Sequence, residues 1–289
     1  MARSGLVLLF VGFSSCVPPP DEPLAQPLGW DDDVRLALAE DIDSSDSTVA
    51  VEFEAKQAEV EILEGTTTLA WTYNGHVPGP LIRGRVGQTL SVRFKNSLPE
   101  STTIHWHGLR VPADMDGTEV SQAPVLPGET FEYRFVLKDA GTYWFHSHIN
   151  SSAQVVSGLY GMLVVERAED EAPLGDELAL VFSDIGLNAD GSLVPSSQEA
   201  SVGAYFGREG NVVLLNGKPM ARLSARAGVP QRWKIVNAAR TRFMQLRVPG
   251  ARLLRIGGDG GLIPKAEEIE AIRLVPGERM DVWVVFGEA

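Results

Sequence analysis

An internal repeat constrains the fold of this chain more than any other feature of its sequence. The first copy runs from an Asn-Gly pair at 74–75 through RVG to the segment TLSVRFKN, which ends at Asn96. The second copy runs from an Asn-Gly pair at 216–217 through RAG to PQRWKIVN, which ends at Asn237. In both copies the closing Asn follows the last Gly by nine positions, from 87 to 96 and from 228 to 237. Self-similarity of this kind predicts two copies of one domain.

Each copy has the sequence pattern of a β-domain. Apolar and polar residues alternate in TVAVEFEAKQAEVEI, which is the period of a half-buried strand, and PGETFEYRF of the first copy has its counterpart in PGERMDVWV of the second. The 29 Gly and 18 Pro residues gather in turn-like clusters such as NGHVPGP, and these favour many short strands over helices. We therefore predict an all-β chain with domains at 48–168 and 174–289. The joint lies near ERAEDEAPLGDE, where charged and turn residues interrupt the strand pattern.

The charge balance excludes one class of partner. The chain has 25 basic and 38 acidic residues, a formal net charge of −13, and no run of Lys or Arg. Phosphate-backbone binding needs such a basic surface. Nucleic acid is therefore not an expected partner.

The N-terminal residues predict an exported protein. Residues 1–16 have one early Arg, an apolar run from Leu6 to Phe13, and small residues before Cys16, which is the pattern of an export signal. The small residues before Cys16 resemble a bacterial lipoprotein signal, in which that cysteine becomes the lipidated first residue; the alternative is a cysteine discarded with an ordinary signal peptide. We expect the bacterial periplasm or cell envelope, with membrane attachment only through a lipidated Cys16. The Pro- and Asp-rich residues 17–47 predict a solvated linker.

Two His-x-His pairs form the candidate metal site. One lies in TIHWHGL and the other in TYWFHSHIN, and together they take four of the five histidines. Side chains at i and i+2 of a strand share a face, so two such strands would bring four imidazoles together. Imidazole suits copper, zinc, iron and nickel, which leaves the metal open. The alternative is that these are strand histidines with satisfied hydrogen bonds. The ligands predicted are His105, His107, His146 and His148.

Other residues near these pairs are expected to have no role in the site. His76 follows an Asn-Gly turn, where a histidine is more often solvated than bound to a metal. Trp106 and Trp144 are interpreted as core aromatics. Neither is assigned a function.

Several motifs of the sequence together resemble those of a known protein family. TTIHWHGLRVPADMDG, PGETFEYRFVLKDAGTYWFHSH and GLYGMLVVE resemble the first cupredoxin domain of laccase-like multicopper oxidases, and LLNGKP through PGERMDVWVV resembles their second domain. The resemblance covers about residue 49 to the end. It implies two cupredoxin-like (plastocyanin-like) Greek-key β-barrels built as sandwiches, the second incomplete at its C-terminus.

The resemblance also implies ligands and a reaction. His105 would bind the type 2 copper, and His107, His146 and His148 the type 3 pair. Asp116 matches the acidic residue that helps to deliver protons to dioxygen, and its spacing from His107 favours this role over the alternative, a turn aspartate before Gly117. The reaction couples oxidation of a small reducing substrate to reduction of dioxygen to water, and a copper cluster suits it because four electrons are needed.

The chain departs from the family in its second copy. Nine and eleven positions after Asn237 stand Leu246 and Val248, where the first copy has His105 and His107. No histidine follows His148, and Cys16 is the only cysteine, so the chain has half of the trinuclear ligands and no type 1 copper site. We therefore expect a fragment, a prematurely stopped gene, or half of a split protein whose partner chain carries the third domain.

Two further functions compete with the oxidase. One is a non-catalytic copper-binding or storage protein, which would use the same four histidines; the six scattered methionines lack the runs expected of a cuprous-ion carrier. The other is a mononuclear metalloenzyme of the cupin kind, which needs a glutamate after the pair and a later single histidine. This chain has neither at the required spacing.

Overall fold

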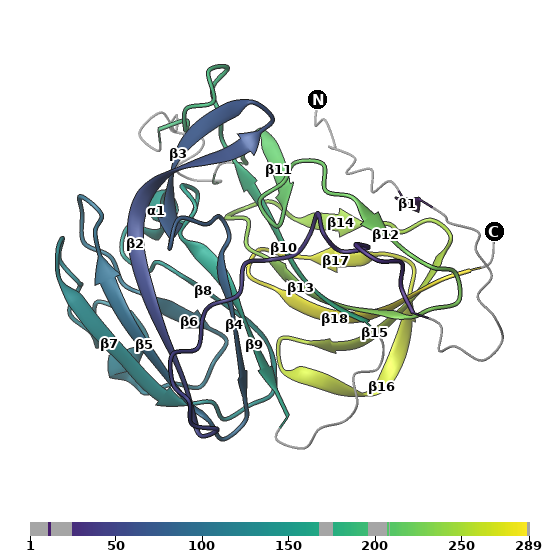
Figure 1. Ribbon diagram of the computed structural model, residues 1–289, viewed down its shortest axis with the longest axis horizontal. Coiled ribbons are helices and arrows are strands. Elements are labelled where there is room, and N and C mark those ends of the chain that lie inside the picture. The colour runs from purple at the N-terminus through teal and green to yellow at the C-terminus, as the bar shows by residue number, and fades with distance from the viewer. Residues whose placement is uncertain (1–10, 13–24, 168–175, 196–206, 208, 288–289) are drawn as a thin grey trace.

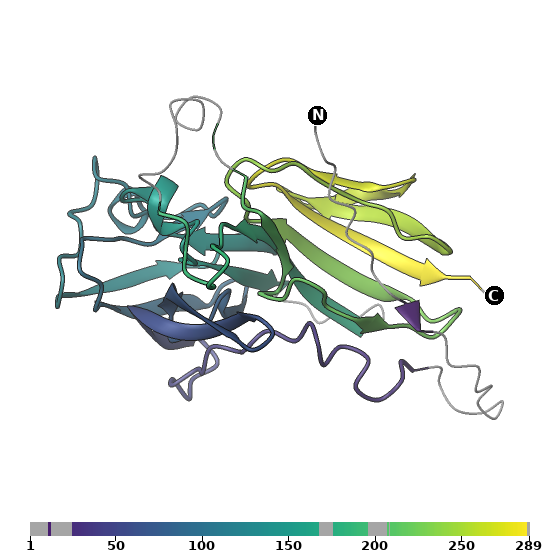
Figure 2. The same ribbon diagram turned by 90° about the horizontal axis from the view of Figure 1, so that it is seen from above.

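The computed structural model describes residues 11–12, 25–167, 176–195, 207 and 209–287. Its described helices are one turn of α-helix, α1 (Ser151–Gln154), and one 3-10 turn, η1 (Ala113–Met115). All other regular elements are strands, in two units that lie side by side (Figures 1 and 2). We call 48–167 the N-terminal unit and 176–287 the C-terminal unit. The all-β prediction is confirmed.

The N-terminal unit is a sandwich of two four-stranded sheets, with strand orders β3-β2-β5-β7 and β4-β9-β8-β6. The strands are β2 (Thr48–Leu63), β3 (Thr66–Tyr73), β4 (Gly79–Arg85), β5 (Thr89–Asn96), β6 (His105–His107), β7 (Thr130–Val136), β8 (Gly141–His146) and β9 (Tyr160–Glu166). Between the sheets lies an aromatic core that includes Phe53, Tyr73, Phe94, Trp106 and Phe145. The two sheets stay separate, as packed sandwich layers do, which agrees with the predicted cupredoxin-like Greek-key domain built as a sandwich.

The C-terminal unit has a six-stranded sheet of order β11-β10-β13-β18-β15-β16 and two small two-stranded sheets, β14-β17 and β1-β12. The strands are β1 (Val11–Gly12), β10 (Asp176–Ile185), β11 (Val212–Leu215), β12 (Leu223–Ser224), β13 (Gln231–Asn237), β14 (Met244–Leu246), β15 (Ala251–Gly258), β16 (Gly261–Ile269), β17 (Ile272–Leu274) and β18 (Arg279–Phe286). Its core is aliphatic around Trp233, which is 1 % exposed.

The sequence repeat is also a structural repeat. In the N-terminal unit β5 pairs in parallel with β2 and antiparallel with β7; in the C-terminal unit β13 pairs in the same two ways with β10 and β18. Asn96 and Asn237, both fully buried, close the central strands with equivalent hydrogen bonds. The Asn96 amide donates to two carbonyls, of Glu100 and Val125, and the Asn237 amide donates to those of Arg242 and Leu274. Repeated polar residues therefore fix both copies in one topology.

The segment before β2 differs from the predicted solvated linker. Val34 is 2 % exposed and belongs to the core of the C-terminal unit. The amide of Ala39 donates to the carbonyl of Leu81, the amide of Leu81 donates to the carbonyl of Ala37, and Asp33 binds Lys218 at 3.1 Å. Figure 2 shows this segment running along one side of both units. Apolar residues among the prolines and aspartates therefore anchor this segment on the two units.

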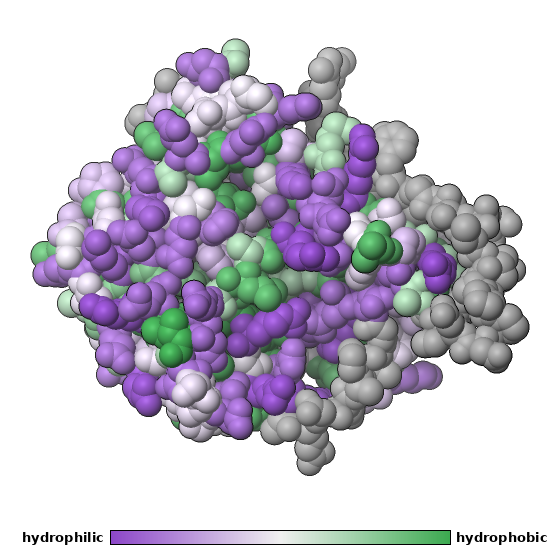
Figure 3. All heavy atoms as spheres, viewed as in Figure 1, coloured by the Kyte–Doolittle hydropathy of each residue, from purple (hydrophilic) through white to green (hydrophobic). Residues whose placement is uncertain are grey.

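Other predictions for the N-terminus and the joint lie outside the described residues. These are most of the export segment at 1–16, Cys16, and residues 168–175 between the units. No helix in the described part has both the length and the apolar composition needed to cross a membrane. On the face drawn in Figure 3, hydrophilic side chains predominate and apolar ones lie in small separate groups.

The two units share a packed interface. A third buried cluster combines Trp144, Tyr160 and Met162 of the N-terminal unit with Val181, Val236 and Ala238 of the C-terminal unit. Beside it, the Thr142 hydroxyl donates to Asp281 at 2.6 Å, and Asp281 accepts from Arg232 and Lys234. Strand β8, which carries part of the histidine motif, is thus held from both sides.

Candidate metal site

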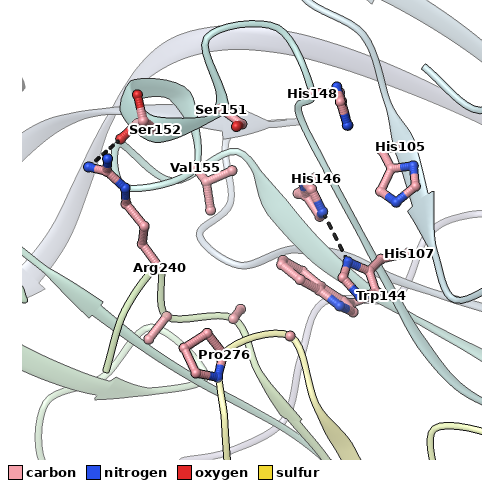
Figure 4. A pocket seen from close by; sticks show the side chains of 13 residues that line it. His105, His107, Trp144, His146, His148, Ser151, Ser152, Val155, Arg240 and Pro276 are labelled. Atoms are coloured by element: carbon pink, nitrogen blue, oxygen red, sulfur yellow. Dashed lines mark hydrogen bonds between the residues drawn. The ribbon is translucent and has the colours of Figure 1, made fainter. Parts of the chain in front are cut away.

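The pairing of two strands brings the histidine motifs together. Strand β6 runs antiparallel to β8, with His105 opposite His146 and His107 opposite Trp144. Side chains opposite each other in such a pair are close neighbours. His148 follows the end of β8, and all four predicted histidines line one pocket of about 360 Å³ (Figure 4).

Three of these histidines could share one ion. One nitrogen each from His105, His107 and His146 lie within 4.8 Å of one another. The ring of His148 is exposed, with its centroid 5.3 Å from that of His105. His76, which was expected to have no role in the site, lies in an exposed turn and does not line the pocket.

Backbone carbonyls orient two of the rings. Nδ1 of His146 lies 2.8 Å from the carbonyl oxygen of Ser147, and Nδ1 of His105 lies 3.1 Å from that of Asp116. A carbonyl only accepts, so each neutral ring carries its hydrogen on Nδ1 and a free lone pair on Nε2. Nε2 of His146 accepts from Nδ1 of His107 at 3.3 Å. Tautomers fixed in this way are typical of metal-binding histidines.

Asp116 lies beside the site, as its predicted role requires. Its Oδ1 is 3.0 Å from Nδ1 of His105, but the hydrogen bond of that nitrogen goes to the Asp116 carbonyl. Oδ1 is buried, and its polar contact is this approach to the ring of His105.

The loop that carries Asp116 is fixed against the strand leading to His105. Gly117 has φ +74°, and a Cβ there would clash with the Ile104 carbonyl, so only glycine allows this approach. The amide of Gly117 donates to Gln122 at 2.9 Å, and the hydroxyl of Tyr133 accepts from both Gln122 and the backbone of Ile104. These contacts set the distance between Asp116 and His105.

Burial and nearby charges give the histidines different pKa values. Burial lowers the pKa of His146 to about 3, and burial with the positive charge of Arg279 lowers the pKa of His107 to about 4. Burial alone would lower the pKa of His105, but contact with the Asp116 carboxylate outweighs it and raises the pKa. His107 and His146 are therefore neutral at pH 7, the form that binds metals.

The C-terminal unit forms one wall of the pocket, which the sequence did not predict. Ala238, Ala239 and Arg240 follow β13, and Pro276 and Gly277 precede β18. The amide of Gly277 donates to the carbonyl of Asn237 at 2.8 Å, so the repeated Asn and PGE motifs hold this wall. Trp144 is buried in the interface cluster, as expected of a core aromatic, and it also lines the pocket. Its position two residues before His146 is the signal that could have shown this.

Comparison with known proteins agrees with this geometry. Residues 54–170 match the family model described as multicopper oxidase. A multicopper oxidase of Mycobacterium tuberculosis is 31 % identical over 268 residues, which cover 83 % of this chain and 52 % of that protein. The structure of a multicopper oxidase from Pseudomonas thermotolerans aligns with a TM-score of 0.78 and 38 % identity, over 84 % of this chain and 59 % of the other. Residues 54–170 belong to the multicopper oxidase family.

A second solved structure extends the likeness over nearly the whole chain. A metallo-oxidase from Campylobacter jejuni aligns with a TM-score of 0.78 and 33 % identity, over 92 % of this chain and 58 % of that one. The chain spans about half the length of these relatives. The fold is thus that of cupredoxin-like multicopper oxidase domains.

The residues present fit the metal of this family. Multicopper oxidases use copper, and neutral imidazoles are among its preferred ligands. Three clustered donors, with Nε2 of His105 and of His146 left without a hydrogen by the tautomer, and a buried carboxylate oxygen nearby give a suitable donor set.

The metal-free chain should lose stability as the pH falls from 7 to 5. In the folded state His146 stays neutral until about pH 3, whereas in the unfolded chain it takes up a proton near pH 6.5. The stability it contributes is therefore complete above pH 6.5 and decreases below it, by roughly 2 kcal/mol at pH 5. His107 acts in the same direction and His105 in the opposite one.

Urea denaturation at several pH values measures this dependence. The variant His146→Gln should flatten the decrease between pH 7 and pH 5, while His76→Gln, at the exposed turn, should not change it. An unchanged slope in His146→Gln would show that His146 is protonated in the folded chain.

Proposed function

We propose that this chain binds copper through His105, His107, His146 and His148 and acts in a copper-dependent oxidoreductase. The reaction couples oxidation of a small donor to reduction of dioxygen to water. The observation that carries the proposal is the convergence of both His-x-His motifs on one pocket by the β6–β8 pairing. Family membership gives this convergence its chemical meaning.

Each residue has a distinct part in this proposal. His105 would hold the type 2 copper, and His107, His146 and His148 would hold the type 3 pair; bound copper supplies one-electron chemistry at the pocket. The carbonyls of Asp116 and Ser147 keep Nε2 of His105 and His146 free for the metal. Asp116, whose Oδ1 lies 3.0 Å from Nδ1 of His105, would hold a proton for dioxygen reduction.

The remaining ligands are proposed to come from protein outside these 289 residues. The sequence has five histidines and one cysteine, Cys16, too few for a full cluster and a cysteine-bound copper. The chain also spans about half the length of its relatives. A separate partner chain, or a longer form of this one, would supply the third domain. Export to the periplasm or cell envelope, with lipid on Cys16, is a further proposal that rests on residues 1–16.

Copper loading of the full chain, with dioxygen uptake measured in the presence of a phenolic donor, tests the function. A half-set of ligands should bind one or two copper ions per chain without turnover. About four ions with dioxygen consumption would show that the ligand set extends beyond these histidines. Failure to retain copper would contradict the proposal.

A further inference from the structure

Trp144 contacts two of the histidine rings with its faces. The indole is 6 % exposed, and its ring centroid lies 4.2 Å from that of His146 and 4.8 Å from that of His107. The interplanar angles are 33° and 30°, so the indole is stacked on the imidazole of His107 and tilted against that of His146. Figure 4 shows it beside these two histidines.

The surroundings of Trp144 hold the indole by packing alone. Its Nε1 is buried and makes no hydrogen bond to a described residue. The indole belongs to the interface cluster, which includes Val181, Val236 and Ala238 of the C-terminal unit. Its orientation therefore depends on how the two units pack.

The turn before β18 closes the same region. A Cβ on Gly277 would lie 3.2 Å from Cε1 of His107 and 3.7 Å from Cζ2 of Trp144. Glycine at this position, with φ +82°, thus lets the C-terminal unit approach the ligand ring without displacing it. The C-terminal unit has no histidine of its own. It bounds the site through this turn and packs against Trp144 of the N-terminal unit.

We propose that Trp144 is a positioning residue of the metal site, which fixes the planes of His107 and His146 and transmits the packing of the C-terminal unit to them. The proposal rests on the proposed copper binding. An imidazole is free to rotate about its side-chain bonds unless its surroundings hold it, and ligands held by their supporting residues bind metals more tightly. Stacking on one indole restrains both rings, because aromatic pairs add to the energy of burial.

Replacing Trp144 with leucine should weaken copper binding by about tenfold, the lower end of the range for residues that orient metal ligands. The electron paramagnetic resonance spectrum of bound Cu²⁺ should also broaden or divide into several species. Trp144→Phe, which keeps an aromatic face, should restore affinity to within about threefold and recover a single spectrum.

Trp106 provides a matched control in the same strand pair. It is fully buried, its Nε1 also lacks a partner, and its ring packs on Tyr133, Phe135 and Phe145 on the opposite face. Trp106→Leu should lower the unfolding temperature as Trp144→Leu does and leave copper affinity unchanged. Equal weakening in both variants, or wild-type affinity and spectrum in Trp144→Leu, would overturn the positioning role.

A measurement without copper separates this proposal from the proposed function. In the metal-free chain the indole ring current should shift the ring-proton resonances of His107 and His146, and Trp144→Leu should remove that shift and broaden both signals. Trp106→Leu should not. If the wild-type chain failed to bind copper, the proposed function would fail, and these spectra would still show whether Trp144 orders the two rings. Unaltered histidine signals in Trp144→Leu would refute the positioning role.

Discussion

Replacing His146 with glutamine is expected to weaken copper binding by more than 100-fold. His146 lies at the centre of the cluster: its ring is 5.2 Å from that of His105, and its Nε2 is 3.3 Å from Nδ1 of His107. Loss of a residue that only orients a ligand costs about 10–100-fold in affinity, so loss of the ligand itself should cost more. Titration of the metal-free chain with copper, in competition with a chelator of known affinity, measures the change.

The other histidines provide the comparison. His148 is exposed and lies outside the group of three close donors, so His148→Gln should weaken binding less than His146→Gln. His76→Gln changes the one histidine outside the pocket and should bind copper as the wild type does. Equal loss in the His76 and His146 variants would show that copper binds elsewhere on the chain.

The local parts of this site could be predicted from the sequence. Strand alternation places His105 and His107 on one face, and the same parity, extended back from His146, includes Trp144. The repeated Asn and PGE motifs identified two copies of one topology, which the pairing of β5 and β13 confirms. These features depend on residues close together in the chain, where periodicity is informative.

The remaining parts depend on contacts between distant residues. Arg279 affects the pKa of His107 from a strand more than 170 positions later, and no local pattern specifies that approach. The tautomer of His105 depends on the Asp116 loop, which Gly117 and Tyr133 hold in place. Val34 lies in a segment rich in proline and aspartate, but it is buried because it packs into the hydrophobic core of the C-terminal unit. The average composition of such a segment predicts a solvated linker, and it does not identify the one residue that is buried.

Replacing Asp281 with asparagine is expected to lower the free energy of unfolding by about 3–5 kcal/mol. The carboxylate is 5 % exposed and accepts from Lys234 at 3.2 Å, from Arg232 at 2.8 Å and from Thr142 of the N-terminal unit at 2.6 Å. Burial raises the pKa of Asp281, but the charges of Lys234 and Arg232 with the Thr142 hydrogen bond outweigh it and lower the pKa. An amide in its place leaves the Lys234 ammonium buried, with its remaining carboxylate, Glu177, at 3.9 Å.

Chemical denaturation of the metal-free variants distinguishes this buried charge from an ordinary ion pair. Glu268→Gln breaks the exposed pair with Arg252, in which both side chains are 61 % exposed, and should change the free energy of unfolding far less than Asp281→Asn does. Adding Lys234→Met to Asp281→Asn removes the uncompensated charge and should recover much of the lost stability; no recovery would assign the loss to the Thr142 contact instead. Because that contact joins β8 to β18 beside the histidines, the two outcomes separate a charge that stabilises one sheet from a link that holds the two units together around the metal site.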